Sequence, residues 1–371
     1  MSQMEALAPA ATPQAARAGG GQRNLGMDLL RVLATYMVMQ IHTGEFFYIG
    51  KDGAVLNTPD AHWVGWLNSL CRTCVPLFVM ISGYFLFPVL GTRQFLRKRF
   101  TRVLFPFVIW CAVYAFYYYA KGESTLHKAL INVLHIPVNY GVEVGHLWFV
   151  YMLLGLYLFA PVLSPWVQGA SRRSLEGFLL LWGIASTTPY LHLWAPEVWG
   201  EAFWNVNPTL YLFTGYLGYI VAAVYIRRFH SEPSSKKTLL AWILIALGYA
   251  VTATGFLHRL GTEVAVPKLE LTWGFTTLNV EMMTVGIFLL LMRPDPFRGN
   301  RARRVLHDVA ARSYGMYLAH IIVLNAVFGL LAPHLNTALL ALPVIALPTF
   351  VLTYLAVKAI SYLPWSKWVV G

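Results

Sequence analysis

Two ionisable side chains, Arg31 and His42, lie in one strongly apolar segment near the start of the chain. Eleven positions at 100° and 1.5 Å per residue place them on the same face of a helix, about 16 Å apart along its axis. A guanidinium binds anionic groups and an imidazole accepts a proton at neutral pH. The pair therefore predicts an elongated substrate, with an anionic group at Arg31 and a reacting group at His42. The alternative is that Arg31 extends to the membrane surface and His42 is a packing residue.

Further ionisable residues lie within or beside other apolar segments. Glu45 follows His42 by three residues, where it either orients the imidazole or simply lies at the membrane interface. Arg72 and Glu281 lie inside apolar segments, and His146 opens one. Each such group costs about 2.5–3.5 kcal/mol at membrane depth and is therefore a functional candidate. His320 is interpreted instead as a packing or hydrogen-bonding residue.

A basic run precedes the third apolar segment. Within it Arg99 and Arg102 are three positions apart, so they face the same way on a helix. They form either an ordinary positively charged loop or a clamp for phosphate groups. Arg303 and Arg304 offer a second basic group on the same predicted side of the membrane.

The composition indicates what kind of scaffold carries these residues. Of the 371 residues, 57% are hydrophobic and only 12% are charged, and the mean hydropathy is +0.56. These values exclude disordered, collagen-like and ordinary water-soluble classes and predict an all-α polytopic membrane protein. The net charge of +12 lies in short loops, so membrane topology explains it better than nucleic-acid binding. Three cysteines in apolar segments predict neither a disulfide framework nor a metal site.

Apolar stretches of spanning length predict a bundle of about ten transmembrane helices. They cover residues 29–48, 66–90, 104–120, 147–164, 174–190, 207–226, 238–256, 272–292, 313–332 and 337–361. Twenty-one of the 28 Lys and Arg residues then fall on the side of the N-terminus, five on the other side and two inside spans. This asymmetry predicts that the N- and C-termini are both cytoplasmic. We expect residues 1–25 to form a flexible cytoplasmic tail. Residues 26–371 are expected to form a single transmembrane domain.

Five segments resemble the acyltransferase-3 family of membrane O-acyltransferases, in the order in which that family has them. They are Asp28 to Ala34 with Ile41-His42, Arg72 with Val75 to Leu86, Arg99-x-x-Arg102 with Leu104 and Pro106, His146-Leu147-Trp148-Phe149, and Ser313 to His320. The resemblance covers residues from about 25 to 325 and implies that residues 26–371 form a transmembrane acyltransferase domain.

The resemblance also implies an activity. Members transfer an acyl group, usually acetyl, from cytoplasmic acetyl-CoA or another acyl-CoA to a hydroxyl of an extracytoplasmic cell-surface polysaccharide or its lipid-linked precursor. In the family the Arg-x10-His pair, here Arg31 and His42, is considered essential. The Arg-x-x-Arg element, here Arg99 and Arg102, is assigned to the CoA phosphates. The resemblance further implies a stand-alone, multi-pass protein of the bacterial cytoplasmic (inner) membrane, with homo-oligomer formation left open.

A mechanism follows for such a bundle. Arg99, Arg102 and Arg31 hold the CoA phosphates, and the pantetheine arm extends to His42, which acts as general base or forms an acyl intermediate. Arg72 and His146 are candidates for stabilising the oxyanion, and Glu281 for supporting His42 or an arginine. The competing hypotheses are a glycan or small-molecule transporter or flippase with these residues along its path, and a catalytically inactive sensor.

Overall fold

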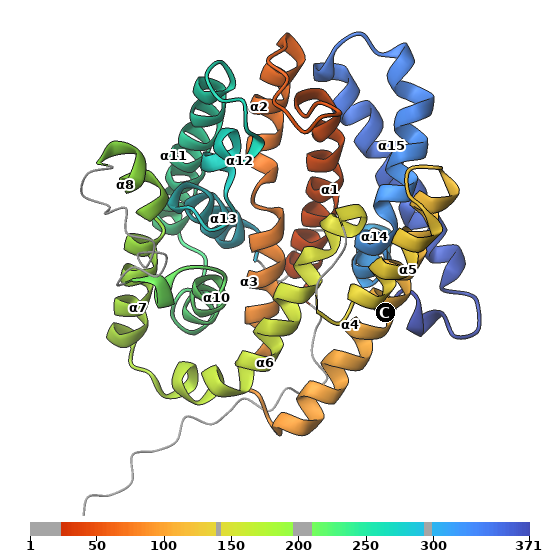
Figure 1. The fold of residues 1–371 in the computed structure, drawn as a ribbon. Helices are drawn as coiled ribbons and strands as arrows, with labels where there is room; N and C mark the ends of the chain where they lie inside the picture. The colour runs from red at the N-terminus through yellow and green to blue at the C-terminus, as the bar shows by residue number, and fades with distance from the viewer. Residues whose placement is uncertain (1–23, 139–141, 196–209, 293–298) are drawn as a thin grey trace, which may run out of the picture.

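The computed structural model describes residues 24–138, 142–195, 210–292 and 299–371. The predicted flexible tail, residues 1–25, therefore lies almost wholly outside the described residues. Throughout the described ranges the regular elements are helices, as Figure 1 shows, and only isolated bridges pair extended residues. The predicted all-α class is confirmed.

The longer helices follow the predicted segments along the chain. They are α1 (Leu25–Tyr48), α2 (Pro59–Cys71), α3 (Cys74–Leu86), α4 (Thr92–Ala120), α5 (Leu126–His135), α6 (Trp148–Gly169), α7 (Arg172–Ala185), α8 (Thr188–Trp194), α10 (Leu217–Phe229), α11 (Ser235–Leu260), α13 (Leu278–Leu291), α14 (Asn300–Leu331) and α15 (Ala338–Ile360). Shorter pieces include η1 (Val142–Leu147), α12 (Val266–Leu269) and η4 (Glu270–Trp273).

Six helical stretches of the described chain are long and apolar enough to cross a membrane, or seven if a bent pair at 266–291 counts as one span. The helices α7, α10 and α13 have only 14, 13 and 14 residues. Each is about 20 Å long, against a hydrocarbon core of about 30 Å. Helix α1 has 24 residues but is too polar, because it carries the ionisable residues singled out above. The number ten and the location of both termini therefore stay predictions.

The second predicted span is broken where its ionisable residue lies. Helix α2 ends at Cys71 and α3 begins at Cys74, so Arg72 and Thr73 form the break. Thr58 caps the N-terminus of α2 by accepting a hydrogen bond from the Ala61 amide, and Pro59 occupies its first turn.

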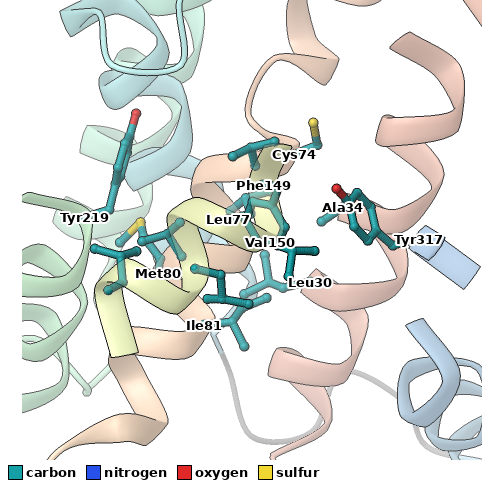
Figure 2. Packing of buried hydrophobic residues seen from close by; sticks show 14 of the residues in the cluster. Leu30, Ala34, Cys74, Leu77, Met80, Ile81, Phe149, Val150, Tyr219 and Tyr317 are labelled. Atoms are coloured by element: carbon teal, nitrogen blue, oxygen red, sulfur yellow. The ribbon is translucent and has the colours of Figure 1, made fainter. Parts of the chain in front are cut away.

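Helices α1 and α3 lie at the centre of the bundle. In Figure 1, α1 runs beside α2 and α3; α14 and α15 flank α1, and α10, α11 and α13 lie on the other side. The largest apolar core joins α1, α3, α6, α10 and α14, and Figure 2 shows part of it, including Leu30, Leu77 and Phe149. Burial of these apolar side chains fixes the faces that α1 and α14 turn toward each other.

Helices α11 and α13 approach closely through two glycines. A Cβ at Gly248 would lie 2.4 Å from the Asn279 carbonyl oxygen, and one at Gly286 would lie 2.6 Å from the Ala241 carbonyl oxygen. No other residue type fits at this helix spacing without a shift of backbone.

Candidate functional site

Three histidine rings from three distant parts of the chain form one cluster. His42 lies on α1, His146 at the end of η1 and His320 on α14. The ring centroids are 6.3 Å apart for His42 and His146, 5.3 Å for His42 and His320, and 5.4 Å for His146 and His320. We call His42, His146 and His320 the histidine cluster. It places two further imidazole rings beside that of His42, which the sequence singled out.

Glu45 orients the His42 imidazole. The Nδ1 atom of His42 lies 2.9 Å from Oε2 of Glu45, one helical turn later on α1. An anionic carboxylate at Nδ1 favours the tautomer with the proton there, which leaves the Nε2 lone pair free to accept a proton. The His42 side chain is 20% exposed, so it is accessible without being fully hydrated.

Tyrosines hold the other two rings in place. The phenol of Tyr317 donates to the His146 carbonyl oxygen at 2.6 Å, and the ring of Tyr114 lies 4.6 Å from that of His146. Nδ1 of His320 lies 2.6 Å from the Tyr317 carbonyl oxygen, so this nitrogen carries the proton and donates. The buried Nε2 atoms of His146 and His320 have no hydrogen-bond partner in the described part of the chain. They are available to a polar ligand atom.

Helix α1 is fixed beside α2 at the level of the cluster. The Asn68 amide donates to the carbonyl oxygens of Gln40 and Ile41 at 3.3 Å each. A Cβ at Gly44 would lie 2.1 Å from the Asn68 side-chain nitrogen, so only glycine leaves room for this contact. The contact holds the turn of α1 that presents His42.

Arg72 lies in a separate buried ion pair close to Glu45. Its Nη2 atom lies 3.4 Å from Oε1 of Glu270, and its guanidinium lies 4.0 Å from the centre of the Trp273 ring. The Glu45 carboxylate interacts electrostatically with Arg72. The Nε atom of Arg72 is buried without a partner among the described residues. Arg72 is therefore a buried positive charge that retains one donor.

Glu281 lies apart from the histidine cluster. Its side chain is buried on α13, and Oε1 accepts a hydrogen bond of 2.5 Å from the Ser186 hydroxyl. The structure thus gives Glu281 a serine partner, and in the described residues it does not bring this carboxyl to His42 or to an arginine.

A large cavity opens at the end of the bundle where α1, α4 and α14 come together. Its volume is about 1710 Å³. Every arginine predicted to bind phosphate lines it: Arg31, Arg99, Arg102, Arg303 and Arg304. In the described part of the chain no carboxylate forms an ion pair with Arg99 or Arg102. The cavity therefore concentrates positive charge that a polyphosphate could neutralise.

Arg31 joins this cavity to the histidine cluster through α1. It lies 3.7 Å from Asp28, and its side chain is 33% exposed. Arg31 and His42 occupy one unbroken helix, which confirms the predicted geometry of about 16 Å along the axis. None of the three histidines is among the described residues that line the cavity, whereas Tyr317 is.

The sequence did not reveal the roles of Tyr114, Tyr317 and His320. Their contacts join α4, η1 and α14, which no local pattern relates. One signal was present, because Tyr317 and His320 are three positions apart and therefore share a face of α14. Of the described residues, no group of three or more His, Cys, Asp or Glu side chains is arranged to hold a metal ion.

Comparison with known proteins gives one extensive match. The sequence model of the acyltransferase-3 family, described as an acyltransferase domain, matches residues 24–358. This range contains the histidine cluster and all the cavity arginines. No solved structure matches.

Two curated proteins are similar over parts of their length. A serine/alanine racemase of Enterococcus gallinarum is 24% identical over 293 residues, which are 74% of this chain and 38% of the racemase. The lysophospholipid transporter LplT of Yersinia enterocolitica is 31% identical over 126 residues, which are 34% of this chain and 31% of the transporter. The matched region thus spans less than two-fifths of either relative.

Proposed function

Since the chain belongs to the acyltransferase-3 family and its apolar helices make it a multi-pass membrane protein, we propose that it transfers an acyl group from acyl-CoA to a glycan hydroxyl across the membrane. The donor is acetyl-CoA, bound from the cytoplasm. The acceptor is a cell-surface polysaccharide or its lipid-linked precursor on the outer side of a bacterial inner membrane.

One observation carries the proposal: the arginine-lined cavity and the histidine cluster lie at two levels of the same helix, α1. The CoA nucleotide is highly charged and cannot enter hydrocarbon, so it stays where Arg31, Arg99 and Arg102 line open space. The pantetheine arm is slender and long enough to extend about 16 Å, the axial distance from Arg31 to His42.

His42 supplies the base. Its Nε2 lone pair accepts the proton of the acceptor hydroxyl while that oxygen attacks the thioester carbonyl carbon. Glu45 stabilises the resulting imidazolium across the 2.9 Å contact. The carbon–sulfur bond then breaks, and the proton passes to the leaving thiolate. The buried, unpartnered Nε2 of His320 accepts a hydrogen bond from the sugar and holds the hydroxyl in line.

Positive charge near the reaction comes from Arg72. Its Nε donor has no partner among the described residues, and it interacts electrostatically with Glu45. It therefore stabilises negative charge on the tetrahedral oxygen. We propose no role in the reaction for Glu281, because its partner is Ser186 on another face of the bundle.

The test uses inverted membrane vesicles that contain the protein, with labelled acetyl-CoA added outside. The proposal predicts label in the glycan fraction of the vesicles, in ester linkage that mild alkali releases. His42→Ala is expected to abolish labelling while CoA binding to the purified protein stays within about threefold, since His42 does not line the cavity. Wild-type vesicles that label no glycan would refute the proposal.

A transporter predicts a different result. A cavity of about 1710 Å³ and the 42° bend between Val266–Trp273 and Leu278–Leu291 are also compatible with transport. The same vesicles would then move unmodified glycan, and His42→Ala would leave that movement intact. The His42 imidazole, oriented by Glu45, favours acyl transfer over transport, because a transport path does not require a defined tautomer.

A further inference from the structure

Tyr317 links the cavity to the histidine cluster. Tyr317 lines the cavity, and its ring centroid lies 5.9 Å from that of His320, which in turn lies 5.3 Å from His42. No histidine of the cluster lines the cavity itself. A series of ring contacts therefore joins the cavity to His42 through Tyr317 and His320.

Tyr317 is held in this place by a single polar contact and by packing. Its hydroxyl donates to the His146 carbonyl oxygen at 2.6 Å, and its ring lies 5.6 Å from that of Phe149. Figure 2 shows Tyr317 in the same packed layer as Ala34 of α1 and Phe149 and Val150 of α6. Tyr317 is only 7% exposed, so it is packed within the bundle although it lines the cavity.

We propose that Tyr317 determines which acyl chains reach the histidine cluster. This inference rests on the proposed acyl transfer and adds the residue that selects the donor. The phenol closes the inner end of the cavity and moves aside only for an acyl group short enough to share the space. One hydrogen bond to a backbone carbonyl is weak enough for donor binding to break.

Closure has a second consequence for the thioester. With the Tyr317 hydroxyl bonded to His146, water that reaches His42 does not reach a thioester in the cavity. Opening without an acceptor would let His42 activate water, whose oxygen would bond to the acyl carbon. The carbon–sulfur bond would break, and free carboxylic acid and CoA thiol would form. Tyr317 thus limits wasteful hydrolysis as well as chain length.

The experiment compares two tyrosines that line the same cavity. Tyr314 also donates its hydroxyl to a backbone carbonyl oxygen, that of Val103 at 2.7 Å, but it lies one turn earlier on α14. The two alanine variants, Tyr317→Ala and Tyr314→Ala, each remove a tyrosine side chain from the cavity lining. The two phenylalanine variants, Tyr317→Phe and Tyr314→Phe, each remove one hydrogen bond to a backbone carbonyl oxygen. Acetyl-CoA and butyryl-CoA are the donors, and transfer and hydrolysis are measured on the purified protein in vesicles.

Tyr317→Ala is expected to raise the butyryl-to-acetyl ratio of kcat/KM about tenfold or more, the scale that one or two methylenes set in a fitted pocket. Tyr317→Phe is expected to raise acetyl-CoA hydrolysis without acceptor about two- to tenfold, the change expected from one hydrogen bond. The Tyr314 variants are expected to change kcat/KM for the two donors by the same factor, because Tyr314 lines the cavity but, in the described part of the chain, does not contact the histidine cluster, so the butyryl-to-acetyl ratio should stay at its wild-type value. Should Tyr317→Ala fail to fold, Tyr317→Leu and Tyr317→Phe give the same two readouts.

Two outcomes would overturn the inference. Equal changes in the Tyr314 and Tyr317 variants would mean that general loosening of the cavity, not this position, selects the donor. Tyr317 variants that transfer acyl groups with wild-type preference and hydrolysis would remove Tyr317 from selection. In either case wild-type transfer would persist, so this failure is distinct from that of the proposed function, in which the wild-type protein uses no acyl-CoA.

Discussion

At the scale of single residues, the account depends on what surrounds His42. A lone imidazole in a helical bundle is ordinary, and the sequence alone left that interpretation open. Three contacts favour a catalytic role over a packing role. They are the Glu45 carboxylate at 2.9 Å and the neighbouring rings of His146 and His320. These contacts give the ring a defined tautomer and two neighbouring imidazoles whose Nε2 atoms have no hydrogen-bond partner among the described residues.

Glu45 should act on turnover and not on donor binding. Glu45→Ala is expected to lower kcat about 10- to 100-fold, less than removal of the base itself, because His42 loses its orienting partner but keeps its lone pair. Glu45→Gln should cost less, since its amide oxygen still accepts a hydrogen bond from the Nδ1–H group. Steady-state kinetics with acetyl-CoA measure both variants. A change confined to the donor KM would contradict an orienting role.

The sequence predicted this residue pair because both members lie on one helix turn, where spacing determines neighbours. It proposed His146 for the same reaction, but it did not predict that the rings of His146 and His320 lie beside that of His42. His146 arrives from η1 and His320 from α14, and only the packed bundle brings these rings within 5.4 Å. For the same reason the partner of Glu281, a serine on the short segment after α7, had no signature in the sequence.

At the scale of elements, helix α4 carries two of the arginines that line the cavity, Arg99 and Arg102. The prediction that Arg99 and Arg102 share a face agrees with their common place in its lining, while Arg97 and Lys98 of the same turn are exposed and do not line it. The role of Arg99 and Arg102 in donor binding stays a prediction.

The double variant Arg99→Ala with Arg102→Ala should raise the KM for acetyl-CoA about tenfold or more, because two charge-assisted contacts to phosphate are lost. The matched control is Arg97→Ala with Lys98→Ala, which removes the same net charge from the same helix. It should change the KM by less than about twofold at physiological salt. Equal effects of the two pairs would indicate general electrostatic attraction and would remove the clamp.

The α11–α13 contact gives a prediction about stability. Gly248→Ala places a Cβ 2.4 Å from a backbone oxygen and is expected to destabilise the fold by about 1–3 kcal/mol through overpacking. Gly155→Ala on α6 meets no atom within 4 Å and should be neutral or slightly stabilising. Thermal unfolding in detergent compares the two. Equal melting temperatures would contradict the close approach of α11 and α13.

At the scale of the whole molecule, hydropathy predicted where helices occur, whereas the number that cross the bilayer stays a prediction. Helices cover at least part of every predicted span, yet α7, α10 and α13 are short, and α1 is too polar for an ordinary span. Arg31, His42 and Glu45 lower the mean hydropathy of α1, although its 24 residues are long enough to span a membrane. The hydropathy pattern also does not predict the break at Arg72 between α2 and α3.

The predicted topology places the α6–α7 connection in the cytoplasm and the α4–α5 connection outside. Single cysteines at Ser171 and Glu123, both exposed, report on these two sides. The natural thiols, Cys71, Cys74 and Cys111, are buried and serve as the background. A membrane-impermeant maleimide should label Glu123→Cys but not Ser171→Cys in intact cells, and inverted vesicles should reverse the pattern. Labelling of both positions from one side would refute the predicted orientation.

The central claim is that the acyl group enters at the arginine-lined cavity and leaves at the histidine cluster, so donor and acceptor work from opposite sides. The most direct test is sealed vesicles holding the protein, with labelled acetyl-CoA on the side of the cavity and the host glycan fraction enclosed on the other. The account predicts labelled ester on the enclosed glycan, lost in His42→Ala. Label that appears only when donor and glycan share one compartment would contradict it.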